Sequence, residues 1–193
     1  MLSLAIAPTV EPVTLEEVKL HLRVGGTAED NRLTDLAIGA RQWVERQTDL
    51  ALLTQSWDWT FATWPSDLYR LEAGLRLPIR PVSAVTSITY LDQSLVTQTL
   101  ATTVYLLQAP SGADPAAGPA SIALKFGQVL PPALVQAGAI TIRFVAGFGA
   151  TAATVPADLR LAILQRCAMV YDGVTDQATV RATLAPYVGL GIA

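Results

Sequence analysis

"ITIRFVAGFGATAATVPADLRLAIL", residues 140–164, passes from an apolar, β-rich run through two glycines into a helical pattern. Gly147 and Gly149, followed by Ala152, outline the turn in which a dinucleotide-binding fold holds a pyrophosphate. Such a turn needs the helix to begin at once, so that its free N–H groups point at the phosphates. Here a further segment intervenes, and Pro156 is the expected first helical residue. The stretch predicts a strand, a glycine bend and a helix that begins at a proline, and a cofactor enzyme using both glycines remains an alternative.

Upstream, the pattern predicts two helices in the first fifty residues. "TLEEVKLHLRV" begins with Thr14 and carries Glu17 three residues later, which is the signature of a capping box. Gly25 and Gly26 interrupt this helix, and a second one, about 20 residues long, restarts after Thr27. Its apolar residues recur at helical spacing: Leu33, Leu36, Ala37, Ala40 and Val44.

The period changes from helical to alternating between residues 51 and 150. Trp57, Trp59 and Phe61 alternate with polar residues, which predicts a strand with one buried face. "AVTSITYLD", "TVYLLQA" and "ASIALKF" predict further short strands, and no helical pattern separates them. Closely spaced strands without helices between them indicate an antiparallel sheet or a small sandwich.

These patterns together predict an α+β protein. Residues 1–50 and 151–175 are expected to form a three-helix core, with an antiparallel β insertion over 51–150. Residues 176–193 are apolar and contain a proline and two glycines, which predicts a C-terminal docking tail, extended or broken, rather than a third part of the compact fold.

The composition bears on the partners of the chain. Hydrophobic residues make up 51% of the 193 residues and charged residues only 15%, below the roughly one quarter usual in soluble domains. A protein this apolar is expected to cover surface against partners, which favours an oligomer. The net charge is −3, and the absence of a basic stripe argues against tight nucleic-acid binding. No apolar run reaches the roughly 18 residues of a membrane span.

The residues that usually carry chemistry lack partners in the sequence. His21 is the only histidine and Cys167 the only cysteine, so neither belongs to a metal-ligand cluster or a nucleophile–base pair of recognisable spacing. The sequence predicts a protein that is not an enzyme, with no catalytic residue, no metal and no cofactor.

In their order along the chain, these segments resemble the head–tail connector, or adaptor, proteins of long-tailed phages and gene transfer agents. "PVTLEEVKLHLRV" and "EDNRLTDLAIGARQWVERQTDLALLTQSWDWTF" are similar to the family's opening helix pair and first strand, and "LPIRPVSAVTSITYLD" to its central strands. "ITIRFVAGFG" with "VPADLRLAIL" is similar to its last strand and third helix, and "LAPYV" to its closing motif. The chain departs after Tyr171, where "DGVTDQAT" replaces a charged stretch.

The resemblance implies a structural role in a virion or gene-transfer-agent particle that is made in a bacterial cytoplasm. About a dozen copies would form a homo-oligomeric ring between the portal protein and a tail or stopper protein. DNA would pass through the channel of the ring without sequence-specific binding. No nucleotide is implied at the two glycines.

Two candidate contacts follow from residue type and position. Trp43 lies off the main apolar stripe of the second helix, so it is a candidate subunit contact, because tryptophan often anchors interfaces. The tail is the candidate portal contact through its apolar side chains and its proline: Val180, Leu184, Pro186, Tyr187, Leu190 and Ile192. The alternative function is a β-domain module that binds a saccharide through Trp57 or Trp64.

Overall fold

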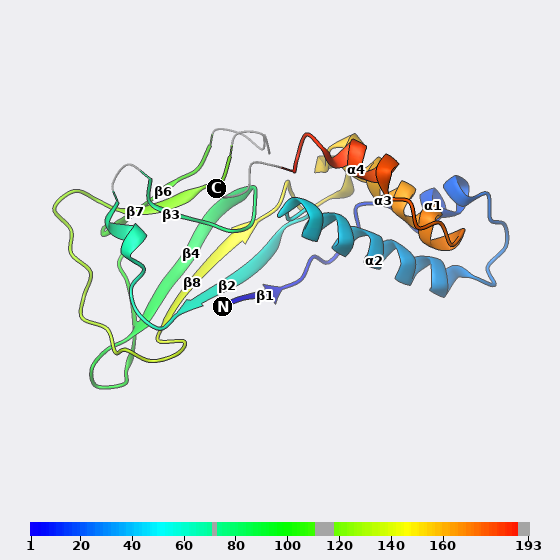
Figure 1. Cartoon of the computed structure of the whole chain (residues 1–193). Helices are drawn as coiled ribbons and strands as arrows, with labels where there is room; N and C mark the ends of the chain where they lie inside the picture. The colour runs from blue at the N-terminus through cyan, green and yellow to red at the C-terminus, as the bar shows by residue number, and fades with distance from the viewer. Residues whose placement is uncertain (71–72, 111–117, 189–193) are drawn as a thin grey trace. The chain divides into compact units, whose positions relative to one another are not determined.

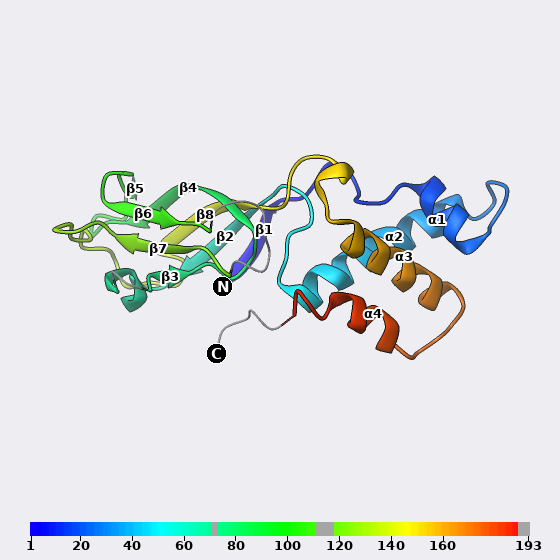
Figure 2. The same ribbon diagram turned by 90° about the horizontal axis from the view of Figure 1, so that it is seen from above.

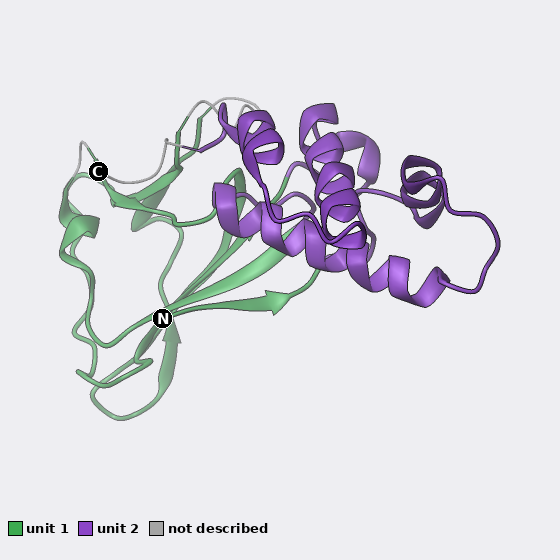
Figure 3. Cartoon of the chain, turned by 45° about the vertical axis from the view of Figure 1, so that its right-hand side comes forward, with its two compact units in different colours: residues 1–7, 55–147 green, residues 8–54, 148–193 purple. Residues whose placement is uncertain are grey.

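The computed structural model describes residues 1–70, 73–110 and 118–188, which divide between two compact units. Residues 1–7 and 55–147 form one of them, here called the β unit (Figure 3). Residues 8–54 and 148–193 form the other, the helical unit. The sequence placed the start of the chain with the helices, whereas the first seven residues belong to the β unit.

The β unit contains two antiparallel sheets (Figure 1). The five-stranded sheet has the order β1-β2-β8-β4-β5, with β1 at Leu2–Ile6, β2 at Gln55–Phe61, β8 at Ile140–Ala146, β4 at Val82–Leu91 and β5 at Thr97–Thr99. The three-stranded sheet has the order β3-β7-β6, with β3 at Leu75–Arg76, β7 at Ser121–Leu124 and β6 at Tyr105–Gln108. A short 3-10 helix, η1 (Ser66–Tyr69), precedes β3.

The core of the β unit lies between its two sheets. Along β8, Ile140, Ile142 and Phe144 are fully buried, whereas Arg143 between them is exposed. This alternation follows from the two-residue period of a strand, which sends successive side chains to opposite faces. The three-stranded sheet lies over one face of the five-stranded sheet (Figures 1 and 2), and its central strand β7 is buried along its whole length. The predicted antiparallel β region is therefore a small sandwich.

The aromatic residues of β2 are less buried than the sequence predicts. Trp57 pairs with Phe144 and therefore shares a sheet face with the buried residues of β8. Nevertheless Trp57, Trp59 and Phe61 are only half-buried. The physical reason is their position: β2 is separated from the edge of the sheet only by the short strand β1, which the sequence analysis did not anticipate.

The helical unit contains four α-helices among the described residues: α1 (Leu15–Leu22), α2 (Asp30–Thr48), α3 (Ala157–Tyr171) and α4 (Ala178–Leu184), with a 3-10 turn, η3 (Ala152–Thr154), before α3 (Figure 2). The predicted capping box is present, because the backbone N–H of Glu17 donates to Thr14 Oγ1 at 3.2 Å and that of Thr14 donates to Glu17 Oε2 at 2.7 Å. Pro156, the expected first helical residue, is instead the N-cap of α3, so the helix begins one residue later than predicted, at Ala157.

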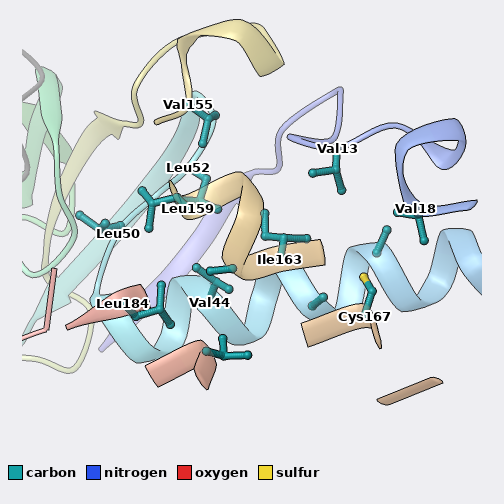
Figure 4. Packing of buried hydrophobic residues seen from close by; sticks show 14 of the residues in the cluster. Val13, Val18, Val44, Leu50, Leu52, Val155, Leu159, Ile163, Cys167 and Leu184 are labelled. Carbon is teal, nitrogen blue, oxygen red and sulfur yellow. The ribbon is translucent and has the colours of Figure 1, made fainter. Parts of the chain in front are cut away.

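A hydrophobic core joins the four helices, and Figure 4 shows part of it. Val44 on α2 and Ile163 and Cys167 on α3 are completely buried in it. Leu184 on α4 points into the same cluster (Figure 4) and is 1% exposed. The core therefore extends from α2 and α3 into the C-terminal part of the chain.

The prediction of a separate docking tail is wrong for residues 178–187. Val180, Leu184 and Tyr187 lie on one face at helical spacing and are 0%, 1% and 9% exposed. Tyr187 also donates a hydrogen bond from its hydroxyl group to Asp158 on α3, at 2.5 Å. The predicted three-helix core therefore has four helices among the described residues, because the apolar face of α4 packs into the core of its own subunit.

Candidate interaction surfaces

The only histidine and the only cysteine of the sequence, His21 and Cys167, have different surroundings in the structure. His21 is exposed on α1, and Cys167 is buried, with its Sγ atom 3.9 Å from the carbonyl oxygen of Leu36. Burial raises the pKa of the Cys167 thiol to about 11, which keeps it in the unreactive protonated form at neutral pH. Within the described residues, no three His, Cys, Asp or Glu side chains come together as a metal site. None of the helices in this part of the chain has the length and apolar character to cross a membrane.

The glycine bend uses its backbone groups within the protein. The N–H of Gly147 donates to the carbonyl of Pro81 at 2.8 Å, and the carbonyl of Gly149 accepts from the N–H of Thr54 at 2.9 Å. A Cβ atom on Gly149 would lie 2.7 Å from the side chain of Thr154, so glycine is required there by close packing. The backbones of both glycines are therefore hydrogen-bonded within the protein, and close packing favours glycine at position 149.

The two tryptophans of the saccharide hypothesis, Trp57 and Trp64, both lie in the β unit. Trp64 donates from Nε1 to the carbonyl of Pro131 at 2.8 Å, and its ring lies 5.5 Å from that of Tyr90. Trp57 has a buried Nε1 that lacks a hydrogen-bond partner among the described residues. A sugar platform needs an open aromatic face and accessible polar groups, and the structure adds no observation in favour of one at these residues.

Trp43 lies at the edge of the helical core. Its side chain is half-buried and packs against the core cluster, and the guanidinium of Arg166 lies 4.7 Å from the centre of its ring. This cation–π contact occupies part of the ring. The remaining exposed part keeps Trp43 available as a subunit contact, which stays a prediction.

The residues predicted to contact the portal separate into three groups. Val180, Leu184 and Tyr187 belong to the core, whereas Pro186 is exposed. Leu190 and Ile192 lie outside the described residues. Val188, another apolar residue of the predicted portal anchor, is 53% exposed.

A groove of about 400 Å³ lies beside this segment, lined by Gln47, Arg181, Leu184, Ala185 and Val188. Sequence reasoning missed this groove, because it exists only where α4 lies next to the end of α2. Its wall is mainly apolar with one arginine, so it is suited to contact with another protein.

Comparison with known proteins shows which solved structures share this fold. No family model and no curated protein matches the chain. Among solved structures, it is similar to a component of the neck of an empty GTA particle computed with C6 symmetry, with a TM-score of 0.80 and 24% identity over 100% of this chain and 97% of that chain. The chain has the fold of a gene-transfer-agent neck protein.

Two further structures agree with this assignment of the fold. A component of the virion of a native gene transfer agent (GTA) particle has a TM-score of 0.78 and 25% identity, and one from the neck of a native GTA particle computed with C12 symmetry has 0.75 and 24%. Both cover 100% of this chain and 97% of that chain. The resemblance to the head–tail connector family is thereby confirmed at the level of the fold, for the β unit and the helical unit alike.

Proposed function

We propose that this protein is a structural head–tail adaptor of a phage-like particle. Copies of the chain form a ring between the portal and a tail or stopper protein, and DNA passes through the channel of that ring. The observation that carries this proposal is the similarity to a GTA neck component over 100% of the chain at a TM-score of 0.80. A likeness that includes both units is more specific than one confined to a helical bundle or a small sandwich.

The symmetry of the similar particles supports a cyclic assembly. One neck structure was computed with C12 symmetry and another with C6 symmetry. A closed ring of identical subunits uses two different complementary surfaces on each copy. We therefore propose about a dozen copies, with Trp43 near one of the contacts between them.

The charges of the chain are compatible with a channel for DNA. The sequence has 13 basic and 16 acidic residues, and several arginines are already paired with carboxylates, including Arg41, Arg143 and Arg160. A wall without unpaired basic clusters does not hold the phosphate backbone strongly. DNA would then slide through the ring without sequence-specific binding.

The C-terminal end of the helical unit is the proposed portal contact. Pro186 and Val188 are exposed beside the groove next to α4, and Leu190 and Ile192 follow them in the sequence. In this proposal, Val180, Leu184 and Tyr187 hold α4 in the core and so position the end of the chain.

Electron microscopy of particles made with and without this protein tests the proposal. A tagged full-length protein should appear as ring-shaped density between portal and tail, and particles made without it should have heads that lack tails. Density located elsewhere in the particle, or normal head–tail joining without the protein, would contradict the adaptor function. Glycan binding by a monomeric protein would instead favour the saccharide alternative.

A further inference from the structure

The outward face of α3 is apolar. Ala157 and Leu161 are exposed and Leu164 and Ala168 half-buried, and their spacing places all four on one side of the helix. The opposite side, with Leu159, Ile163 and Cys167, is completely buried in the core. α3 is thus apolar on two opposite sides, which in a soluble protein is typical of a helix that is covered on both.

The polar side chains of α3 contact other parts of the helical unit. Arg160 binds Glu17 on α1, and Asp158 accepts a hydrogen bond from Tyr187. Gln165 accepts one from Thr183 at 3.1 Å, and Arg166 lies over the ring of Trp43. Each of these polar residues has a partner within the helical unit. The stripe of Ala157, Leu161, Leu164 and Ala168, here called the α3 stripe, is exposed at the first two and half-buried at the last two, and it carries no polar side chain.

A second observation comes from Gly39 in the middle of α2. A glycine inside a helix is less favourable than alanine, because it loses more backbone freedom on folding. Gly39 is exposed, and a Cβ atom built on it meets no other atom within 4 Å. Packing within the subunit therefore gives no reason for a glycine at this position. A neighbouring helix that approaches the backbone of α2 closely would give one.

The surroundings of Gly39 form a complementary surface. Arg32, Leu36, Gly39 and Trp43 recur along α2 with the same alternating steps of four and three residues as the α3 stripe. Leu36 and Trp43 are half-buried on either side of the glycine, which leaves a depression between two larger side chains. Such steps allow the side chains of one helix to fit into the spaces of another.

We propose that the α3 stripe of one copy packs over Gly39 on α2 of the next copy, with Leu161 seated between Leu36 and Trp43. This inference rests on the proposed ring. The surface around Gly39 borders α3, because Arg32 lies over the ring of Tyr171 and Trp43 lies against Arg166, and it shares no residue with the α3 stripe. A head-to-tail contact in a closed ring uses two different surfaces of each copy.

The size of the contact sets how the proposal has to be tested. From Ala157 to Ala168 the stripe is about 16 Å long, and at a width of about 10 Å it covers about one fifth of the ~800 Å² that each partner buries in a stable interface. Other surfaces must contribute to the ring, and subunits in dilute solution should associate only weakly through this stripe. The test therefore includes assembled particles.

The substitution Gly39→Leu should change subunit stability and ring assembly in opposite directions. Leucine is the better helix former and has free space here, so the melting temperature of the subunit should rise by about 2–4 °C. The same side chain fills the depression, so the number of copies in each purified particle, measured by quantitative immunoblotting, should fall by about tenfold or more. Adding Leu161→Ala to Gly39→Leu should restore much of the loss, because the shortened residue makes room.

Cross-linking provides a readout that does not depend on the strength of assembly. In a Cys167→Ala background, Gly39→Cys with Leu161→Cys should give disulfide-linked oligomers in oxidised particles. Species larger than one subunit on a non-reducing gel can form only through bonds between copies, so their size reports contact between subunits. Gly39→Cys with Leu20→Cys is the matched control, since Leu20 is 81% exposed on α1.

The outcomes divide clearly. Cross-links with Leu161 and not with Leu20, together with loss and rescue of copy number, support the proposal. Unchanged copy number in Gly39→Leu particles, or equal cross-linking of both pairs, overturns it while leaving the adaptor function intact. Absence of the unmodified protein from the neck would instead overturn the adaptor function itself.

Discussion

Glu17 on α1 accepts a hydrogen bond from Arg160 on α3, and the same carboxylate accepts the backbone N–H of Thr14 at 2.7 Å. Arg160 also donates to the carbonyl of Pro12 at 3.0 Å. One acidic side chain therefore closes the capping box of the first helix and ties that helix to α3, far along the chain. This small network fixes the start of the helical unit.

Thr14→Ala should destabilise the protein by about 0.5–2 kcal/mol, because it removes the side chain that accepts the N–H of Glu17. Urea unfolding followed by circular dichroism measures the change. Thr175→Ala, at an exposed position between α3 and α4, is the control and should leave the midpoint unchanged. Equal effects of the two substitutions would contradict a capping role.

Stability should fall in acid in part through Glu17. The hydrogen bond from the backbone of Thr14, with a contribution from Arg160, holds the pKa of Glu17 below its ordinary value of 4.5. A lowered folded-state pKa contributes stability above about pH 4.5, and this is lost as the pH falls through the folded value. Melting temperatures of Glu17→Gln should therefore vary less with pH than those of the unmodified protein between about pH 5 and 3. Identical pH profiles would refute this.

Arg41→Ala should destabilise the helical unit by about 3–5 kcal/mol, because it leaves two carboxylates without their shared partner. Arg41 is 7% exposed and lies 2.7 Å from both Glu11 and Glu45. Arg46→Ala, on the exposed side of α2, is the comparison and should change unfolding by less than about 0.5 kcal/mol. A similar effect of both substitutions in denaturant titrations would show that the buried pairing contributes little.

Particle assembly should survive the combined change His21→Ala and Cys167→Ser. His21 is exposed and Cys167 is a buried, protonated thiol, so neither is expected to react. The buried hydroxyl should lower the melting temperature somewhat, because serine is less favourable than cysteine in an apolar core. Particle yield measured with the folded variant is the test, and loss of assembly would point to a role for one of these residues.

Val188→Asp should weaken the joining of the protein to portal-bearing heads without unfolding it, since Val188 is 53% exposed. Deleting residues 180–193 is the poorer experiment. It removes Val180, Leu184 and Tyr187 from the core, at about 1.5–3 kcal/mol for each large apolar side chain. Val174→Asp, 50% exposed before α4, is the matched control. Normal occupancy of heads by the Val188 variant would place the portal contact elsewhere.

Local spacing was enough to predict the elements whose partners lie close in sequence. Thr14 and Glu17 are three residues apart, so their capping box depends on one turn of backbone. The apolar, β-rich run that begins at Ile140 predicted a strand, which the structure has as β8. The α+β class and the resemblance to the connector family followed from the order of such segments.

Tertiary structure alone decided which surface each apolar face meets. Val180, Leu184 and Tyr187 already formed an apolar face in the sequence, but only the packing of α4 on the helical core shows that they belong to the same subunit. Arg160 and Glu17 are 143 positions apart, and the strand beside Trp57 is β1, from the very start of the chain. Helical and strand periods determine the direction of a side chain within its own element, whereas its burial depends on contacts that close long loops, and those distances leave no periodic trace in the sequence.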